Sequence, residues 1–334
     1  MKIHVNGVRN LIETKARSAG RKLYSILLQE HENESPLFDP LENTSLLTPD
    51  VDGEGYWVGG PSPFYDEEKD ELYIYYRLRD PYRRGWKSVI AKTQDGEELE
   101  EVKELTAEEF EAHSLEGGAL QKKDGEYILY ISYHEKSSGQ WKIDRTKSDT
   151  VEGLKADNRE EMDLTTGFTH VKDPVVDGDD IIVHTASKNF LDHGNFRVEN
   201  PSTDPEVEKI EFADESSSGR ITSTLELRDQ KYFFYDWLPS IIFTGEEKTK
   251  IGKAEEGEIE DLMPGRKAIG SASGTKSLRY VKAVEVDEEI WFYYEKSMPG
   301  KGHELCIYKM DKASVTDKLE ELDSREILSG PSGI

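Results

Sequence analysis

The feature that most constrains the fold of this sequence is a repeat of short aromatic segments. Five segments rich in aromatic and β-branched residues begin at residues 71, 126, 180, 231 and 289, so that successive starts lie 51 to 58 residues apart. They read ELYIYYRL, EYILYISY, DIIVHTAS, KYFFYDWL and EIWFYYEK. Such segments are typical of β-strands and are too short for an ordinary helix. A fixed period of this length indicates a repeat architecture.

The surroundings of each aromatic segment repeat as well. An apolar run and a turn precede each segment, which makes the segment the second arm of a β-hairpin. A third strand candidate follows, and acidic stretches such as LEEVKELTAEEF and PEVEKIEFADE could add an outer strand. Three or four antiparallel strands in about 50 residues are the pattern of a propeller blade.

The sequence therefore predicts an all-β fold, a five-bladed β-propeller with a short N-terminal arm. We expect the propeller over residues 51–334 and the arm over residues 1–50, partly irregular or helical, with a candidate helix over residues 7–30. Two β-sandwich domains would also contain many short strands, but they show no regular period across a whole chain. The sequence leaves open which terminus closes the propeller.

Composition excludes several classes of partner and cofactor. The chain has 69 acidic and 43 basic residues and a net charge of −26, which disfavours nucleic acid and anionic membranes. It has one cysteine, Cys306, and its eight histidines lack the paired spacing of zinc ligands, so we expect no metal cofactor. A structural calcium ion stays an alternative, because its oxygen ligands leave no compact signature. No membrane span or signal peptide is evident, and we expect an acidic cytoplasmic protein.

The candidate catalytic residues lie where the first strand of each repeat begins. First strands of propeller blades run beside the central axis, so their entries converge on one pocket. Glu116 enters an otherwise apolar strand, where desolvation predicts a raised pKa and proton donation near neutral pH. Asp173 precedes a proline, and Lys172 and His170 would hold it ionised. Structural roles stay open for both: a hydrogen bond between blades for Glu116 and a salt bridge with Lys172 for Asp173.

The expected substrate-binding residues come from the same entries and from the far ends of the second strands. They are Arg79, His170, Lys172, His184, Arg220, Asp236, Arg279, Tyr280 and Glu295. The second-strand ends also carry a weaker set, Arg77, Asp80, Tyr133, His134 and Trp237. Aromatic residues at blade rims fit sugar stacking, but alternating aromatics also pack blades together. We expect the packing role for Tyr75, Tyr130, Tyr235 and Tyr293.

Three fragments resemble a known group of enzymes. LEGGALQKKDGEYILYISYH, HVKDPVVDGDDIIVHTAS and LRYVKAVEVDEEIWFYYEKSMPGKGHEL are similar to segments of the five-bladed carbohydrate-active propellers. That group comprises glycoside hydrolase families 43 and 32 and the family 130 mannoside phosphorylases, and the resemblance covers residues 51–310. It implies that Glu116 is the general acid and that Asp173, in the Asp-Pro entry, orients or tunes that acid.

The sequence departs from these families in two places. The residues Gly60-Pro61-Ser62 stand where the hydrolases carry the aspartate that activates water. The glutamate lies in the second repeat and the Asp-Pro entry in the third, an order that differs from the hydrolases and resembles the phosphorylases. In the phosphorylases, phosphate held by basic residues replaces that water. The arginine that follows the acid in that family is replaced here by Ala119 and Leu120. The basic residues that would suit phosphate or a carboxylated sugar are Arg79, Lys172, Arg220 and Arg279.

Three functions are therefore compatible with the sequence. The first is a glycosidase that hydrolyses a carbohydrate or oligosaccharide with inversion, in which Glu116 protonates the leaving oxygen and a second carboxylate about 6.5–9.5 Å away activates water. The second is a phosphate-dependent glycoside phosphorylase, which a lone Glu116 beside basic side chains would favour. The third is a non-catalytic carbohydrate-binding propeller.

Overall fold

The computed structural model describes most of the chain. The described residues are 35–164, 166–188, 192–201, 205–215, 218–238, 247–265 and 267–329. The candidate helix over residues 7–30 lies outside them.

The regular structure of the described residues is almost entirely β. Consecutive strands pair antiparallel with their neighbours in sets. The first set is β2 (Trp57–Asp66), β3 (Glu71–Arg79), β4 (Lys87–Thr93) and β5 (Glu100–Thr106). The second is β6 (Ala112–Lys123), β7 (Glu126–Glu135), β8 (Trp141–Ser148) and β9 (Arg159–Glu161), with a short 3-10 turn, η1 (Ala156–Asn158), before β9.

The remaining sets follow the same order. The third is β10 (His170–Asp177), β11 (Asp180–Ala186), β12 (His193–Glu199) and β13 (Glu206–Phe212). The fourth is β14 (Arg220–Leu227), β15 (Gln230–Trp237), β16 (Lys248–Glu255) and β17 (Glu258–Asp261). The last is β18 (Leu278–Val286), β19 (Glu289–Ser297) and β20 (His303–Asp311). The predicted hairpins and the two acidic outer strands, β5 and β13, are therefore confirmed.

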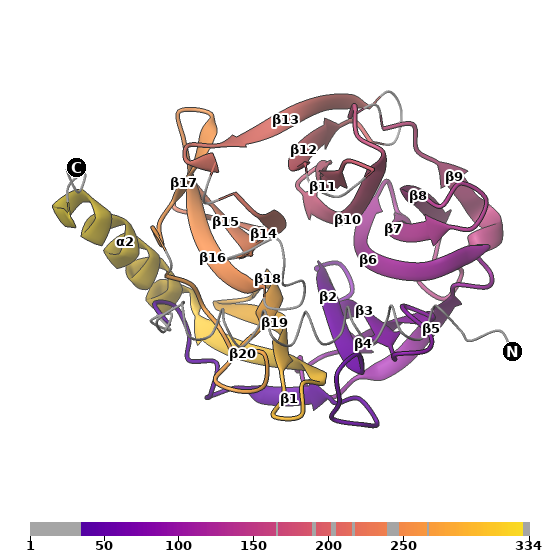
Figure 1. Ribbon diagram of the computed structural model, residues 1–334, viewed down its shortest axis with the longest axis horizontal. Helices are drawn as coiled ribbons and strands as arrows, with labels where there is room; N and C mark the ends of the chain where they lie inside the picture. Colours follow the sequence, from indigo (N-terminus) through magenta and orange to yellow (C-terminus); the bar gives the residue numbers. More distant parts are fainter. Residues whose placement is uncertain are drawn as a thin grey trace, which may run out of the picture.

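The first strands of the sets surround a common centre. Figure 1 shows β2, β6, β10, β14 and β18 nearest the middle of the molecule, with the later strands of each set farther out. Each first strand contacts the next one, and β18 contacts β2. The all-β prediction is confirmed, and the number of blades stays a prediction.

The N-terminal part of the described chain completes the last set of strands. β1 (Thr44–Leu47) pairs antiparallel with β20, so a segment that we expected in the arm forms the outer strand of this sheet. The aromatic ring of Phe38 stacks on Phe292 and Tyr294, with ring centroids 5.2 Å apart in both pairs, and on Tyr308 at 5.5 Å. The question of which terminus supplies a closing strand is thereby answered.

A C-terminal helix that the sequence analysis did not anticipate covers the same set. α2 (Lys312–Ser329) contacts β19 and β20 and lies on the outside of the molecule in Figure 1. Val315, Leu319 and Leu322 are buried and lie on one helical face. No helix in the described part of the chain is long and apolar enough to cross a bilayer.

The aromatic second strands form the core between neighbouring sets. Tyr75, Tyr130, Tyr235 and Tyr293 are fully buried, which confirms the packing role expected for them. Tyrosine suits this position because it buries a large ring and keeps a hydroxyl that can find a hydrogen-bond partner. The Tyr75 hydroxyl, for example, donates to the backbone carbonyl of Glu116 in the next set at 2.6 Å.

Every first strand carries an irregularity at an equivalent place. The pairing register with the second strand shifts between Gly59 and Ser62, Leu115 and Gly118, Lys172 and Val175, Ile221 and Ser223, and Arg279 and Lys282. At three of these bulges the backbone is left-handed, with φ of +59° at Gly60 and +54° at both Asp173 and Tyr280. Because a bulge bends its strand and re-aims side chains, these five bulges decide what faces the centre.

We expect the docking of the N-terminal segment to contribute strongly to stability. Phe38 is 1% exposed, so Phe38→Ala removes a buried ring and should lower the free energy of unfolding by about 3–5 kcal/mol. Urea denaturation followed by tryptophan fluorescence measures this change.

Leu41 provides the matched control, since it lies in the same segment and is 70% exposed. Leu41→Ala should leave the denaturation midpoint within experimental error. Equal midpoints for wild type and Phe38→Ala would show that the segment does not pack on the last sheet.

Candidate functional site

The five bulges meet around a narrow cavity of about 10 Å³, room for one water molecule. All five first strands line it, with Gly60, Gly117, Asp173, Thr222 and Tyr280 among the lining residues. Charged side chains from the strand entries and from neighbouring strand ends gather at the same end of these strands. We call this group the charged layer: Arg77, Arg84, Glu116, Lys172, Asp173, Arg220, Asp236, Glu247, Arg279 and Glu295.

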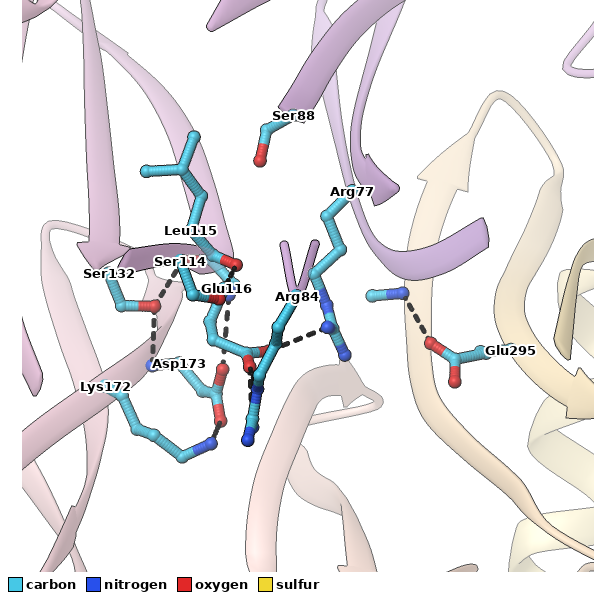
Figure 2. Close-up of polar contacts among 12 residues, drawn as sticks. Arg77, Arg84, Ser88, Ser114, Leu115, Glu116, Ser132, Lys172, Asp173 and Glu295 are labelled. Atoms are coloured by element: carbon cyan, nitrogen blue, oxygen red, sulfur yellow. Dashed lines mark hydrogen bonds and ion pairs between the residues drawn. The ribbon is translucent and has the colours of Figure 1, made fainter. Parts of the chain in front are cut away.

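Glu116 is buried between two arginines of the first set. Arg77 Nη1 lies 2.9 Å from Glu116 Oε2, and Arg84 donates to Oε1 from Nη2 at 2.9 Å and from Nε at 3.1 Å. Figure 2 shows Arg77 on one side of the carboxylate, the Asp173–Lys172 pair on the other, and Arg84 reaching it between them. The contact between neighbouring sets that we considered for Glu116 exists, but its partners are guanidinium groups and not a backbone amide.

The predicted rise in the pKa of Glu116 is wrong. Burial does raise this pKa, but the charges of Arg77, Lys172 and Arg84 lower it further, and the resulting pKa is about 2. The sequence showed the apolar strand around Glu116 but not the arginines that reach it from β3 and from the loop after β3. A carboxyl with this pKa is ionised at neutral pH and does not serve as a proton donor there.

Asp173 is also buried and paired. Lys172 Nζ lies 3.0 Å and Arg220 Nη1 3.1 Å from its Oδ2, and the Gly117 N–H donates to its Oδ1 at 3.3 Å. Burial raises the pKa of Asp173, but Lys172 and Arg220 hold it well below its usual range. The salt bridge with Lys172 that the sequence left open is present.

His170 does not take the place expected for it. Its Nδ1 accepts a hydrogen bond from the backbone N–H of Trp141 at 3.2 Å, and its pKa is lowered by burial. His184 is the histidine whose charge lowers the pKa of Asp173, and it does so only while its own ring is protonated. Burial lowers the pKa of His184 itself to about 3, so the ring is neutral at pH 7.

Two further arginines organise the other half of the charged layer. Arg220 donates from Nη2 to Asp236 Oδ2 at 2.6 Å and to Glu247 Oε1 at 3.2 Å. Arg279 donates from Nη1 to Glu247 Oε2, and from Nε and Nη2 to Glu295 Oε1 at 2.8 and 2.6 Å. Glu247 therefore bridges the two arginines, and each group of the charged layer has a partner of opposite sign, as burial of charge requires.

Asp236 has a pKa shifted opposite to those of the other carboxyls. Its Oδ1 accepts a hydrogen bond from the Tyr280 backbone N–H at 2.9 Å. Burial is the largest influence and raises its pKa, Arg220 lowers it, and the nearby Glu247 raises it again, so that the pKa is about 6. By contrast, Arg279 and Arg220 outweigh burial at Glu247 and lower its pKa to about 2. Asp236 is thus a carboxyl of the layer that can carry a proton near neutral pH.

Glu295 occupies the entry of the first set, where β2 has no carboxylate of its own. The Gly60 N–H donates to Glu295 Oε2 at 3.0 Å, and His303 Nδ1 lies 2.6 Å from Oε1. A Cβ atom on Gly59 would lie 2.3 Å from Glu295 Oε2, so the carboxylate needs the glycine. Burial raises the pKa of Glu295, but Arg279 and His303 hold it far below its usual range.

Tyr280 lies among three guanidinium groups. Its ring centroid is 4.1 Å from Arg220, 5.4 Å from Arg279 and 5.5 Å from Arg77, measured to the guanidinium carbons. Arg79 lies at the end of β3 and stacks on Trp57, with 3.9 Å between the guanidinium carbon and the ring centroid. Each substrate-binding residue expected from the sequence, apart from His170, is thus part of the charged layer or beside it.

Several weaker candidates make other contacts. Asp80 pairs with Arg83 at 2.7 Å, the Tyr133 hydroxyl donates to Asp144 at 2.8 Å, His134 stacks on Trp141, and the Trp237 ring lies under Lys250. The sequence analysis did not single out Arg84, Glu247 or His303. Arg84 and Glu247 lie outside the strands, in the loop after β3 and directly before β16, where strand periodicity gives no signal.

Among the described residues, no group of three or more His, Cys, Asp or Glu side chains is arranged to hold a metal ion. The expected lack of a metal cofactor, the calcium alternative and the cytoplasmic location stay predictions.

Comparisons with known proteins identify the fold. No protein-family model matches this sequence, and no curated protein matches it. Among solved structures, the RS223 β-xylosidase is 15% identical, with 80% of this chain and 95% of that chain covered and a TM-score of 0.59. The GH43_1 enzyme from Xanthomonas citri, solved with xylotriose, is 13% identical, with 80% and 90% covered and a TM-score of 0.59.

An endo-arabinase from Bacteroides thetaiotaomicron is 11% identical, with 80% of this chain and 98% of that chain covered and a TM-score of 0.56. At these identities the likeness shows the fold alone. The chain therefore has the β-propeller fold of family 43 glycoside hydrolases, which confirms the resemblance drawn from the sequence fragments.

We expect the ionised carboxylate of Glu116 to stabilise the fold. In Glu116→Gln the buried charge of Arg77 loses its partner, so the free energy of unfolding at pH 7 should fall by about 3 kcal/mol. Because the folded-state pKa is lowered from 4.5 to about 2, this contribution is fully present above pH 4.5 and is lost as the pH falls toward 2. The difference between wild type and variant in urea denaturation should therefore shrink below pH 4.5.

Glu126→Gln is the matched control, because Glu126 is exposed and begins the other strand of the same hairpin. Its denaturation midpoint should equal that of the wild type at each pH. A Glu116→Gln variant as stable as wild type at pH 7 would contradict the buried ion pair.

Proposed function

We propose that this protein is a glycosidase-like, carbohydrate-active enzyme whose sugar substrate binds over the charged layer. In this proposal the five sets of strands are the blades of a five-bladed propeller. The closed ring of contacts from β2 through β6, β10 and β14 to β18 and back to β2 supports that blade count. The fold shared with a β-xylosidase and an endo-arabinase supports a carbohydrate substrate, and places pentosides first among substrates to test.

The observation that carries the enzymatic part is that two buried carboxyl groups of one layer, Glu116 and Asp236, have different ion-pair partners, which shift their pKa values in opposite directions. Glycoside hydrolysis with inversion needs one carboxyl that is protonated and one that is ionised. Asp236, with its pKa near 6, meets the first requirement, and Glu116, with its pKa near 2, meets the second. When the environments of two carboxyl groups move their pKa values apart, the group with the higher pKa is assigned as the acid and the other as the base.

We therefore assign the proton donor to Asp236 and the ionised partner to Glu116, with Asp173 as a positioning residue. In the proposed step the Asp236 proton passes to the glycosidic oxygen as the bond to the anomeric carbon breaks. Water attacks that carbon from the opposite face and gives a proton to Glu116. Arg84, which is 54% exposed, is the guanidinium that can leave Glu116 when substrate arrives.

Other carboxylates in the layer argue against phosphorolysis. A phosphorylase site was expected to hold a lone Glu116 beside basic groups, whereas Asp173, Asp236, Glu247 and Glu295 lie in the same layer. A specific observation does favour a second candidate, binding without catalysis. The entry of β2 has no carboxylate of its own, and Glu295, which fills this place, is fully buried against Arg279 and His303.

A substrate screen separates these functions. We expect hydrolysis of a 4-nitrophenyl glycoside among pentosides and hexosides, without a requirement for phosphate. Asp236→Asn should keep substrate affinity and lower kcat by about 100-fold or more, since positioned proton transfer contributes 10²–10⁴. Because the acid must be protonated, kcat/KM in the wild type should fall as the pH rises above about 6, and this limb should be absent in the variant.

Asp229→Asn is the control, since Asp229 is exposed in the turn of the same β14–β15 hairpin and asparagine tolerates its left-handed backbone. An unchanged kcat in Asp236→Asn would refute the acid assignment. Sugar binding without turnover of any glycoside, with or without phosphate, would establish the binding-only alternative.

A further inference from the structure

The end of β3 and the loop after it hold more positive charge than their surroundings neutralise. Arg77 and Arg84 share one carboxylate, that of Glu116. The guanidinium carbon of Arg79 lies over the Trp57 ring, and no carboxylate in the described part of the chain forms an ion pair with Arg79. Its Nε is buried and lacks a hydrogen-bond partner. Three guanidinium groups with one carboxylate leave an excess of about two positive charges at this edge of the charged layer.

The three arginines are close enough to repel one another. Burial is the main cause that lowers the pKa of Arg79, to about 10, and the charges of Arg84 and Arg77 lower it further. Elsewhere in the charged layer, Arg220 and Arg279 each meet two or three carboxylates. A cluster with more guanidinium groups than carboxylate partners can bind an anionic ligand, even on a chain with a net charge of −26.

The cluster is accessible from solvent. The side chain of Arg84 is 54% exposed, and Tyr82 in the same loop is 89% exposed. The loop is held in place: the Tyr82 N–H donates to Asp80 Oδ1 at 2.8 Å, and the Leu115 N–H of β6 donates to the Gly85 carbonyl at 2.7 Å. An ordered loop thus presents an aromatic ring two residues away from an arginine that faces the site.

We propose that Arg79 and Arg84 bind the carboxylate of an acidic sugar, a uronic acid unit of the substrate. The planar guanidinium fork matches the two oxygens of a carboxylate, and the stacking on Trp57 fixes the plane of Arg79 before the ligand arrives. The ring of Tyr82 offers an apolar face for the sugar ring. This inference rests on the proposed function, because it names the substrate class of the same site.

The test compares matched sugars that differ only in the carboxylate. Isothermal titration calorimetry is run with the methyl glycosides of glucuronic, galacturonic and mannuronic acid, in both anomers, and with the corresponding neutral methyl hexosides. We expect at least one uronide to bind ten-fold or more tightly than its neutral counterpart at 50 mM NaCl. The preference should decrease at 500 mM NaCl, because salt screens exposed charges.

Two variants assign the preference to the cluster. Arg79→Gln should reduce the ratio of uronide to neutral affinity about ten-fold, and Arg79→Lys should restore part of it through charge alone. Arg228→Gln is the control, because Arg228 is an exposed arginine paired with Glu320 away from the site. The ratio is taken within each variant, so a general loss of stability does not change it.

The outcomes separate this inference from the proposed function. Neutral glycosides that bind or are cleaved while no uronide binds better would overturn the inference and leave the proposed function intact. A uronide preference that depends on Arg79, without turnover, would support the inference and contradict the enzymatic proposal. Inorganic phosphate is the last probe. If phosphate competes with the uronides, binds the wild type as tightly as they do and loses this affinity in Arg79→Gln, then the cluster is a phosphate site. That result would overturn the uronic acid substrate class.

Discussion

Five strands that meet around one axis leave little space where they come together, and this crowding governs the rest of the structure. Each first strand has a β-bulge at an equivalent position, and the bulge turns one or two residues of the strand toward the centre. The residues that line the resulting narrow cavity include Gly60, Gly117 and Gly118, where a Cβ atom would collide with neighbouring side chains. The bulges therefore both permit the close approach of the strands and place polar entries side by side.

The charged side chains at the strand entries lie together in a buried layer, so each of them needs an ion-pair partner of opposite charge. A buried carboxylate or guanidinium without a partner is strongly destabilising. The hairpins supply part of the compensation locally, since Arg220 lies opposite Asp236 and Arg279 opposite Glu295 in the strand register. The remainder comes from a distance: Glu116 takes its partners from the first set, and Glu247 joins two arginines of different sets. The pKa of each carboxyl follows from this pairing more than from its own strand.

The sequence predicted the parts of this arrangement that repeat. The period of aromatic segments identified the hairpins, the core tyrosines and the entries that converge, because those features depend on local patterns. The same period also placed Arg220 and Asp236 on one pair of adjacent strands and Arg279 and Glu295 on another. The sign of the pKa shift at Glu116 was not predictable, because Arg77 and Arg84 approach it only in the tertiary structure. The helix α2 was predictable but overlooked, since Asp311 caps it and Val315, Leu319 and Leu322 are spaced i, i+4 and i+7.

Tyr280 shows how strain and charge are combined at the centre. Its backbone has a φ of +54°, which a bulky residue adopts only when surrounding contacts enforce it, at a cost of about 1–3 kcal/mol. The N–H of Tyr280 donates a hydrogen bond to Asp236, the same carboxyl whose pKa is raised. That geometry puts the phenol ring among Arg77, Arg220 and Arg279, where its face stabilises their charges. Tyr280 thus contacts both Asp236, whose pKa is raised, and the arginines that lower the pKa values of the neighbouring carboxyls. A change in the protonation of Asp236 would therefore act on a hydrogen bond made by this strained residue.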